Sequence, residues 1–352
     1  MKVLLINPEI TNYRIGIYEM IGKELDLTVL HFGKYIDNKN LGFKQLNAKL
    51  LKLGPFYISK IFLHRICSKF DIIISDGNLR YLDRNLLILN PFRTYKWINW
   101  GIGLSASLDK KLDSDTRFDF FRFLIFRNVD AHLLYSDYPI MKYLSNRINS
   151  DKLFVAWNTI INNDIINLTS KKDSIIFVGS LYKQKGIFEL LEVYKIYILN
   201  NNFKFKLHIV GGGQEYDSIK SYIYKYNLNQ YIYLHGPIYD PGTLAFLYSR
   251  SFLSISPNQA GLSVLTSMSY GVPFVTKRDA ITGGEIFSIK HLFNGYFYNS
   301  KEELLEILIN IEKNQDFLLN MGENARTFYL EQRAPEKLVK KVIESCNYVL
   351  NS

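Results

Sequence analysis

The segment Phe177–Gly186 places lysines beside a glycine turn at the end of an apolar run. A buried strand would end near Gly179, and a helix would begin after Gly186. Backbone N–H groups at the start of a helix attract phosphate, and the ammonium group of Lys185 would add a full positive charge. The segment therefore indicates a phosphate site, although a solvated loop with two ordinary lysines would have the same pattern.

Two further stretches repeat the order strand, small residues, helix. Ile209–Glu215 contains Gly211, Gly212 and Gly213, and glycine lets a ligand approach the backbone closely. Tight turns also need glycine, so this glycine cluster alone is weak evidence for a ligand site. Ser256–Pro273 enters a loop, begins a helix of small residues at Gly261 and ends in Gly-Val-Pro. A packed crossover helix is expected there in either case.

A carboxylate after a glycine pair is the fourth candidate. Glu285 follows Thr282-Gly283-Gly284 and could accept hydrogen bonds from sugar hydroxyl groups. The alternative is a glutamate at a helix N-terminus, where the helix dipole favours negative charge.

The elements that must position these residues alternate between strand and helix. The apolar runs are short, continuous and rich in Ile, Leu and Val, which is typical of strands buried on both faces. The predicted strands are Lys2–Asn7, Leu25–Phe32, Asp71–Ser75, Trp97–Trp100, Ala131–Tyr135, Leu153–Trp157, Ile175–Val178, Phe205–Val210, Tyr231–His235, Phe252–Ser256 and Pro273–Thr276. Segments whose apolar residues recur at helical spacing lie between these strands, such as Ile187–Leu199 and Leu304–Ile311. This alternation predicts an α/β protein with parallel sheets, whose ligands bind at the carboxyl ends of the strands.

The pattern restarts near Asn162–Lys172, a polar stretch without long apolar runs. We therefore expect an N-terminal Rossmann-like domain over 1–165 and a C-terminal one over 166–334. A last helix over 335–352 is expected to pack back on the N-terminal domain.

The order and spacing of the four stretches resemble the C-terminal domain of family-4 (group 1) retaining glycosyltransferases, which have the GT-B fold. The resemblance covers Ile175–Tyr298 and is weaker over 1–165, where it rests on Asn12-Tyr13-Arg14, Trp100–Gly103 and Trp157-Asn158-Thr159. It implies two Rossmann-like domains with parallel sheets facing a central cleft, with the acceptor bound by 1–165 and a nucleotide-sugar by 166–334.

The chain departs from the family pattern at charged positions. Ser180 stands where the family has arginine, and Ile102 where it has histidine, while Lys185 is kept. Two glutamates that the family separates by seven residues fall on Asn258 and Thr266. The chain therefore resembles a divergent branch that lacks both motif glutamates.

The mechanism that the resemblance implies is an internal return without a protein nucleophile, in which stabilising the leaving diphosphate dominates. The residues it assigns to catalysis are Lys185, Asn258 and Glu285. The residues expected to bind the donor are Arg14, Gly179, Ser180, Gly211, Gly213, Glu215, Pro237, Ile238, Gly261, Leu262, Ser263 and Thr266. No required metal and no cofactor are expected, because the nucleotide-sugar is a substrate.

Arg14 follows the first predicted strand at its carboxyl end. We expect it to supply the guanidinium group that Ser180 lacks. A surface arginine at the start of a helix is the competing interpretation.

The charge and composition of the chain indicate which kinds of partner it could bind. The net charge is +10, with 23 basic and 16 acidic side chains in 1–165 against 20 and 17 in 166–352. A basic N-terminal half suits an anionic membrane or a lipid pyrophosphate, although codon bias would give the same excess. The segment Lys44–Lys69 mixes cations with apolar side chains, as an interfacial patch or a merely solvated helix pair would. The aromatic segment Arg117–Arg127 is expected to be chiefly core.

Other features narrow the class further. No recognition motif supports nucleic acid as a partner. Cys67 and Cys346 lie outside any Cys-x-x-Cys motif, and no apolar run is long enough to span a membrane. We expect a cytoplasmic protein, with peripheral contact to the inner face of the cell membrane.

The sequence thus predicts a metal-independent glycosyltransferase that moves a sugar from a nucleotide-sugar to a glycan or lipid-linked oligosaccharide. Retention of configuration and a place in bacterial surface polysaccharide synthesis, such as O-antigen or capsule, follow from the resemblance. The alternative is a non-catalytic nucleotide-sugar-binding homologue that supports a partner enzyme, which the loss of both motif glutamates favours.

Overall fold

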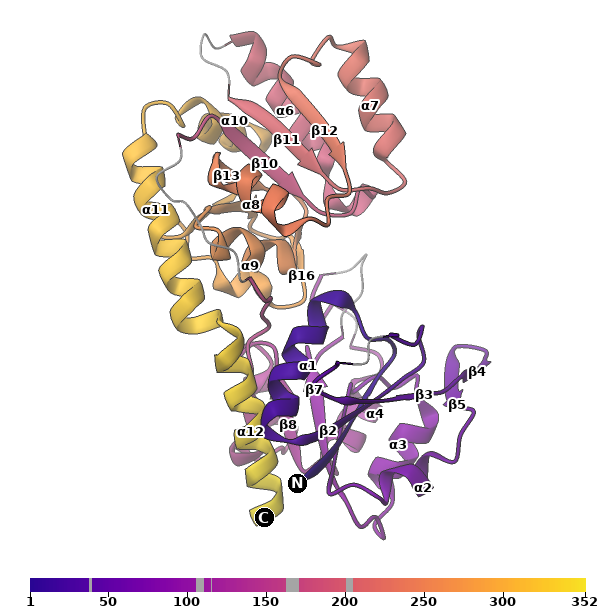
Figure 1. Ribbon diagram of the computed structural model, residues 1–352. Helices are drawn as coiled ribbons and strands as arrows, with labels where there is room; N and C mark the ends of the chain where they lie inside the picture. The colour runs from indigo at the N-terminus through magenta and orange to yellow at the C-terminus, as the bar shows by residue number, and fades with distance from the viewer. Residues whose placement is uncertain (38–39, 106–110, 115, 163–170, 201–204) are drawn as a thin grey trace. The chain divides into compact units, whose positions relative to one another are not determined.

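The computed structural model describes residues 1–37, 40–105, 111–114, 116–162, 171–200 and 205–352 (Figure 1). The chain forms two compact units. The first comprises Met1–Ser105, Asp113–Ile161 and Ala334–Ser352, and the second comprises Ala106–Leu112 and Asn162–Arg333. The predicted boundary between residues 165 and 166 lies outside the described residues.

The first unit is built on a seven-stranded parallel sheet with the order β3-β2-β1-β6-β7-β8-β9. Its elements are β1 (Lys2–Asn7), α1 (Asn12–Glu24), β2 (Asp26–His31), β3 (Lys44–Asn47), β4 (Leu50–Leu53), β5 (Phe56–Ser59), α2 (Leu63–Cys67), β6 (Ile72–Ser75), α3 (Leu82–Leu89), β7 (Lys96–Gly101), α4 (Asp119–Phe126), β8 (Ala131–Leu134), α5 (Ile140–Ser145), a 3-10 turn (Ser150–Lys152) and β9 (Leu153–Val155).

Helices cover both faces of this sheet. Alternate residues of β1 point to opposite faces, so Val3 and Leu5 enter one core while Leu4 and Ile6 enter the other. The first core is closed by α1 and by α12 (Pro335–Asn351), which runs beside α1 in Figure 1. The second core is closed by α2, α3, α4 and α5. The C-terminal helix therefore packs on the first unit.

The second unit is built on a six-stranded parallel sheet with the order β12-β11-β10-β13-β15-β17. Its elements are β10 (Ser174–Val178), a 3-10 turn η2 (Lys183–Lys185), α6 (Ile187–Asn200), β11 (Lys206–Val210), α7 (Tyr216–Lys225), β12 (Ile232–Gly236), α8 (Pro241–Ser249), β13 (Ser251–Ile255), β14 (Gln259–Ala260), α9 (Leu262–Ser269), β15 (Phe274–Lys277), β16 (Ile281–Thr282), a 3-10 turn η3 (Glu285–Ser288), β17 (Gly295–Tyr298), α10 (Lys301–Ile309), α11 (Gln315–Phe328) and a π-helical turn (Tyr329–Arg333).

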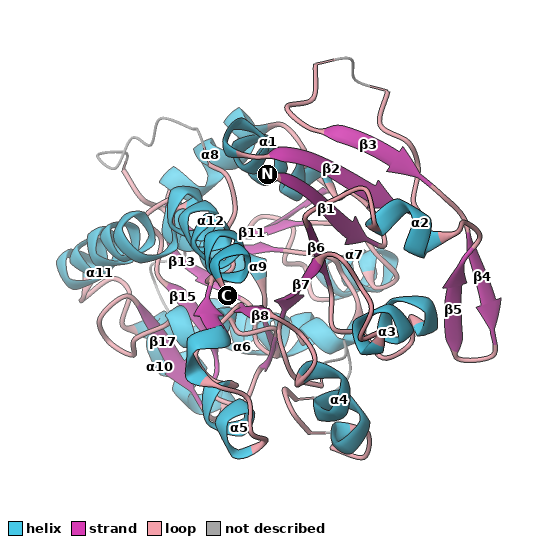
Figure 2. Ribbon diagram, turned by 90° about the horizontal axis from the view of Figure 1, so that it is seen from below, coloured by secondary structure: helices cyan, strands magenta, loops and turns pink. Residues whose placement is uncertain are grey.

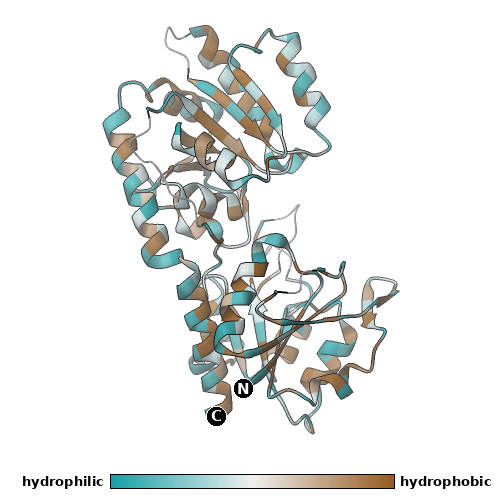
Figure 3. Cartoon of the chain, viewed as in Figure 1, coloured by the Kyte–Doolittle hydropathy of each residue, from teal (hydrophilic) through white to brown (hydrophobic). Residues whose placement is uncertain are grey.

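When the strands of each sheet are renumbered from 1 in chain order, the second sheet has the order 3-2-1-4-5-6, which is that of a doubly wound fold. The first sheet has the same order, with β9 added as a seventh strand at the edge. The prediction of an α/β protein with parallel sheets in two Rossmann-like halves is therefore confirmed. In Figure 3, α11 and α12 carry alternating hydrophilic and hydrophobic bands, the amphipathic pattern of helices with one packed side.

Two segments differ from their predicted structure. Lys44–Lys69 is not a helix pair, because it forms β3, the antiparallel hairpin β4–β5 and the short helix α2. The prediction that Arg117–Arg127 is chiefly core is wrong for three of its five aromatic side chains. Phe123 and Phe126 are buried, but Phe118, Phe120 and Phe121 are 55%, 73% and 56% exposed. The helix carries aromatic residues on all of its sides, but the sheet covers only one side of the helix.

Candidate functional site

The second sheet reverses its strand order between β10 and β13, and the segments that leave their carboxyl ends carry most of the predicted site. In doubly wound sheets the connections after these two strands run to opposite faces, so they leave a crevice at that point. Phe177–Gly186 covers the end of β10 and the turn after it, and Ser256–Gly261 follows β13. The topology therefore puts two of the four predicted stretches at the usual position for a ligand.

Lys185 ends the turn η2 and is only 8% exposed. Its Nζ lies against the backbone of Gly179, 3.5 Å from where a Cβ atom at that glycine would be. Among the described residues Lys185 forms no ion pair, although its Nζ stands 5.9 Å from the centroid of the Tyr182 ring. A buried cation of this kind is positioned to meet an anion that the protein itself does not supply.

The electrostatic surroundings of Lys185 are unusual for a lysine. Burial lowers its pKa to about 8, and the negative charge of Glu285 partly opposes this shift. Since desolvation disfavours the charged form, an anionic ligand beside Nζ would raise the pKa again. Perturbed groups of this kind concentrate at functional sites, but structural charges can be perturbed too.

The glycines of the second stretch are required by the packing of two turns. Gly211 has φ +148° and Gly213 has φ +152°. A Cβ atom at Gly211 would lie 1.9 Å from the carbonyl oxygen of Gly179, and one at Gly213 would lie 2.4 Å from that of Leu181. The Leu181 N–H donates to the Gly212 carbonyl at 2.9 Å, which ties the two turns together. The glycines thus hold the lysine turn in place, whether or not a ligand also contacts them.

Asn258 lies directly beside the lysine turn. Its N–H donates to the Lys185 carbonyl at 3.3 Å, and its Nδ2 is 2.5 Å from where a Cβ atom at Gly186 would be. Gly186 has φ +71°, a left-handed conformation that suits glycine. The structure therefore brings Asn258 and Lys185 together across the ends of β10 and β13.

Gly261 precedes α9 and gives it no side-chain cap. The first N–H groups of a helix have no partner within the helix, so those of Leu262 and Ser263 can serve an anion. Thr266, one turn further on, donates its hydroxyl to the Leu262 carbonyl at 3.1 Å. This bond uses the hydroxyl proton of Thr266 within the helix and leaves it a weaker donor to a ribose.

Glu285 begins η3 and is 7% exposed. Its Oε2 accepts a hydrogen bond from the Gly283 N–H at 3.1 Å, and the Thr282 hydroxyl oxygen accepts bonds from the N–H groups of Gly284 and Ile286 at 3.0 and 3.2 Å. The parallel pairing of β14 with β16 holds this turn beside the Asn258 loop. The predicted catalytic residues Lys185, Asn258 and Glu285 are thus gathered at one end of the second sheet.

The remaining donor-binding candidates of the second unit lie in the turns after β10, β11 and β12. Ser180 is exposed, and Glu215 is half-buried at the start of α7. Pro237 and Ile238 follow Gly236, whose carbonyl accepts the Gly211 N–H at 2.8 Å. The turns after neighbouring strands are therefore joined, and their roles in donor binding stay predictions.

Arg14 belongs to the first unit and is 6% exposed, so the surface interpretation is wrong. Its Nη2 donates to the Tyr135 hydroxyl and to Asn158 Oδ1, both at 2.8 Å. Its guanidinium carbon lies 5.5 Å from the Trp100 ring centroid and 5.3 Å from that of Tyr135. Arg14 thus connects α1 with the ends of β7, β8 and β9, and its contact with a donor stays a prediction.

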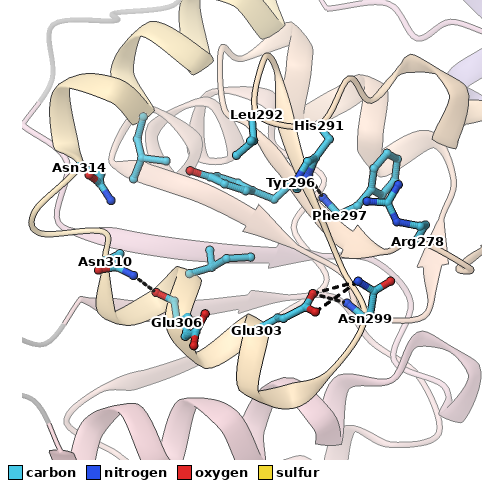
Figure 4. Close-up of a pocket in the computed structure, with 12 residues that line it drawn as sticks. Arg278, His291, Leu292, Tyr296, Phe297, Asn299, Glu303, Glu306, Asn310 and Asn314 are labelled. Atoms are coloured by element: carbon cyan, nitrogen blue, oxygen red, sulfur yellow. Dashed lines mark hydrogen bonds between the residues drawn. The ribbon is translucent and has the colours of Figure 1, made fainter.

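The predicted site coincides neither with a cluster of metal-ligating side chains in the described residues nor with the pocket at the edge of the second sheet. In the described residues no group of three or more His, Cys, Asp or Glu side chains is placed to hold a metal ion. A pocket of about 330 Å³ lies at the edge strand β17 and at α10 and α11 (Figure 4). None of the predicted site residues lines it. Several of its polar groups bond to each other, as Asn299 does to Glu303 and the Phe297 N–H to His291.

Two residues near Lys185 were not predicted. The Tyr182 hydroxyl donates to Gln259 Oε1 at 2.6 Å, which bridges the lysine turn and the Asn258 loop. Tyr182 lies two residues after Ser180 and Gln259 lies directly after Asn258, but their contact joins positions 77 apart in the sequence. A pattern of single residues carries no signal for such a pair.

The two parallel-sheet halves define the class of fold as GT-B, the fold of a large group of glycosyltransferases. Anabaena HepE, solved in complex with UDP, has this fold, with a TM-score of 0.72 at 13% identity over 99% of this chain and 100% of that one. At that identity the likeness speaks for the fold alone.

The sequence itself matches a family. Residues 160–328, which hold every predicted site residue except Arg14, match the model of the glycosyl transferases group 1 family. An uncharacterized glycosyltransferase of Methanocaldococcus jannaschii is 29% identical over 175 residues, 48% of this chain and 44% of that protein. The alpha-monoglucosyldiacylglycerol synthase of Acholeplasma laidlawii is 25% identical over 165 residues, 46% of this chain and 40% of that protein. The matched region thus spans less than half the length of these relatives.

Proposed function

We propose that this chain is a group 1 glycosyltransferase that moves a sugar from a nucleotide-sugar to a glycan or lipid-linked oligosaccharide. We further propose that the transfer retains the configuration at the sugar, needs no metal and serves the synthesis of a bacterial surface polysaccharide. The family match over 160–328 supports the class of reaction. The name of the Acholeplasma relative supports a lipid acceptor, and the UDP bound to Anabaena HepE supports a nucleotide donor.

The observation that carries the proposal is the buried side chain of Lys185, which forms no ion pair in the described part of the chain and lies where the second sheet reverses its order. Loss of a nucleoside diphosphate builds negative charge on its β-phosphate, and a preorganised cation stabilises that charge. The uncapped start of α9 at Gly261 adds N–H groups for the same purpose. Asn258 and Glu285 would bind hydroxyl groups of the donor sugar, and Thr266 would contact the ribose.

The direct test is donor binding followed by transfer. The melting temperature is measured with UDP-, GDP-, ADP- and CMP-sugars, since a ligand at a hundredfold excess over its Kd stabilises by about 2.7 kcal/mol. The sugar that stabilises the protein is then tried with lipid-linked and free glycan acceptors, with and without a chelator. We expect one nucleotide class to raise the melting temperature and transfer to survive chelation. A protein that ignores all four classes would not be a nucleotide-sugar enzyme.

The alternative function is a nucleotide-sugar-binding protein without catalysis. It is favoured by the neutral side chains of Asn258 and Thr266, and by the hydroxyl of Thr266 that bonds within its own helix. The non-catalytic function would be supported if a nucleotide-sugar raises the melting temperature but its sugar is neither transferred nor hydrolysed. NMR of any product also decides between retention and inversion.

The pKa of Lys185 predicts how donor binding responds to pH. Burial lowers that pKa to about 8, so the ammonium is present at neutral pH and is lost as the pH rises through about 8. Affinity for a diphosphate should therefore fall by up to about tenfold for each pH unit above that value. Isothermal titration with the nucleoside diphosphate at several pH values measures this.

The control for this titration is Lys185→Ala. Lys172 is a second lysine whose pKa burial lowers to about 8, but it donates to the carbonyls of Ser249 and Ser251 and remains in the variant. Binding by the variant should be weak and flat over the same range. An equally steep pH dependence in the variant would assign the effect to another group.

A further inference from the structure

We propose that one flank of the first unit, formed by the hairpin β4–β5 with α3 and α4, docks on a bilayer that contains anionic phospholipid. No helix in the described part of the chain is long and apolar enough to cross a membrane, so any such contact would be peripheral. In Figures 1 and 2 the hairpin, α3 and α4 follow one another along the same side of the first unit. The proposal does not depend on which reaction the second unit performs.

The hairpin exposes an apolar face. Leu51 pairs with Ile58 and Leu53 with Phe56, and because side chains alternate, these four share one face of the ribbon. Leu51, Leu53 and Phe56 are 42%, 47% and 40% exposed. Among the described residues, the two strands of the hairpin form a sheet by themselves. The other face of the hairpin holds it to the domain, where the Tyr57 ring lies 5.5 Å from the Tyr81 ring.

Large apolar side chains continue along the flank. On and after α3, Leu86 and Phe92 are 68% and 86% exposed, and Phe62 before α2 is 78% exposed. On α4, Phe120 and Phe121 are 73% and 56% exposed and pack edge to face. Helix α3 contacts both β5 and α4, so the elements that carry these side chains are neighbours. Large exposed apolar side chains on neighbouring elements of a folded domain indicate an interaction site.

The charge of the chain segment that carries the hairpin and α3 indicates what covers the flank. Residues 44–93 hold nine basic and three acidic side chains, a net charge of +6. All three carboxylates are engaged: Asp71 accepts the Lys2 N–H, Asp76 pairs with Arg84, and Asp83 accepts the Ser59 N–H. Six exposed cations have no ion pair within the described residues, namely Lys49, Lys52, Lys60, Arg65, Lys69 and Arg80.

An anionic bilayer would accommodate both the exposed apolar side chains and the exposed cations of the flank. Apolar side chains enter the boundary between headgroups and acyl chains, while the cations beside them meet the phosphates. A protein partner or a second copy would need acidic groups facing the six cations. Lys49 and Lys60 are joined at the base of the hairpin, where the Lys60 N–H donates to the Lys49 carbonyl at 2.8 Å, so they lie beside its apolar face.

The test is cosedimentation of the full chain with vesicles. One set contains phosphatidylcholine alone and the other equal parts of phosphatidylcholine and phosphatidylglycerol. We expect binding to the anionic set at low salt, loss of this binding as salt rises, and little binding to the neutral set. The triple variant Lys49→Ser, Lys52→Ser and Lys60→Ser should bind about 10- to 100-fold more weakly at low salt.

A second variant tests the apolar part. Leu51→Ser, Leu53→Ser and Phe56→Ser together should lower anionic-vesicle binding about tenfold, and adding Phe120→Ser and Phe121→Ser should lower it further. These side chains are exposed, so the melting temperature should stay near that of the wild type. The matched control is Lys220→Ser, Lys225→Ser and Lys313→Ser, which removes the same charge from exposed positions of the second unit and should bind normally.

Three results would overturn the proposal. The first is a wild-type protein that ignores anionic vesicles at low salt. The second is a control variant that loses as much binding as the hairpin variants. The third is self-association in sedimentation velocity that the hairpin variant abolishes, because the flank would then be an interface between copies of the chain.

Discussion

Replacing Lys185 with alanine is expected to lower sugar transfer by about 10²–10³-fold, the scale on which one preorganised charge stabiliser acts. Lys185 is 8% exposed, and its ammonium group lies against Gly179 and forms no ion pair among the described residues. The other residues of the turn are not placed to replace it, because Ser180 carries no charge and the side chain of Lys183 is exposed. The rate is measured at saturating donor, so that weaker binding alone does not account for the loss.

The matched control is Lys183→Ala. Lys183 belongs to the same 3-10 turn, but its side chain is exposed and has no place in the predicted site. Its variant should keep nearly the full rate and the same stabilisation by the nucleoside diphosphate. If Lys185→Ala also keeps the full rate, the diphosphate lies elsewhere and the proposed site is wrong.

Replacing Gly211 with alanine is expected to destabilise the second unit by about 2–5 kcal/mol, a large share of the 5–15 kcal/mol typical of a domain. The backbone at Gly211 has φ +148°, which other residues rarely adopt. The added Cβ atom would also lie 1.9 Å from the Gly179 carbonyl oxygen, and that oxygen belongs to backbone rather than to a flexible side chain. The turn that holds Lys185 would have to move.

Denaturation with two probes measures this change. All three tryptophans, Trp97, Trp100 and Trp157, belong to the first unit, so their fluorescence follows that unit, while circular dichroism follows both. We expect Gly211→Ala to shift the transition seen by circular dichroism more than the one seen by fluorescence. Gly212→Ala is the control, because its Cβ atom would make an ordinary contact of 3.5 Å with Pro237. Equal effects of the two substitutions would show that the packing of these turns does not limit stability.

Local pattern was enough to predict most of the two sheets. Strands such as β1 and β10 are short apolar runs, and the predicted limits of Lys2–Asn7 agree with the observed strand. The signal is strong because a strand buried on both faces needs apolar residues at every position. The same argument fails for β4 and β5, whose exposed hairpin mixes lysine with leucine and does not belong to the main sheet.

The candidate site was predicted in part for a similar reason. Each stretch has its own local signature of glycine, small residue and charge, so Lys185, Asn258 and Glu285 could be named separately. That they meet depends on the order of β10 and β13 in the sheet and on the pairing of β14 with β16. The link between Tyr182 and Gln259 has the same origin.

The sequence alone determined the class of fold, the two-part plan of the chain and the residue types that could meet a phosphate, because periodicity and turn chemistry are properties of neighbouring residues. Only the tertiary structure decided which face of an element is covered. It buries Arg14 among tyrosine and tryptophan rings and leaves Phe120 and Phe121 exposed, although a charged residue usually lies outside and an aromatic one inside. It also gives Gly211 its role through a contact with Gly179, since burial and close approach depend on segments that are distant in the sequence.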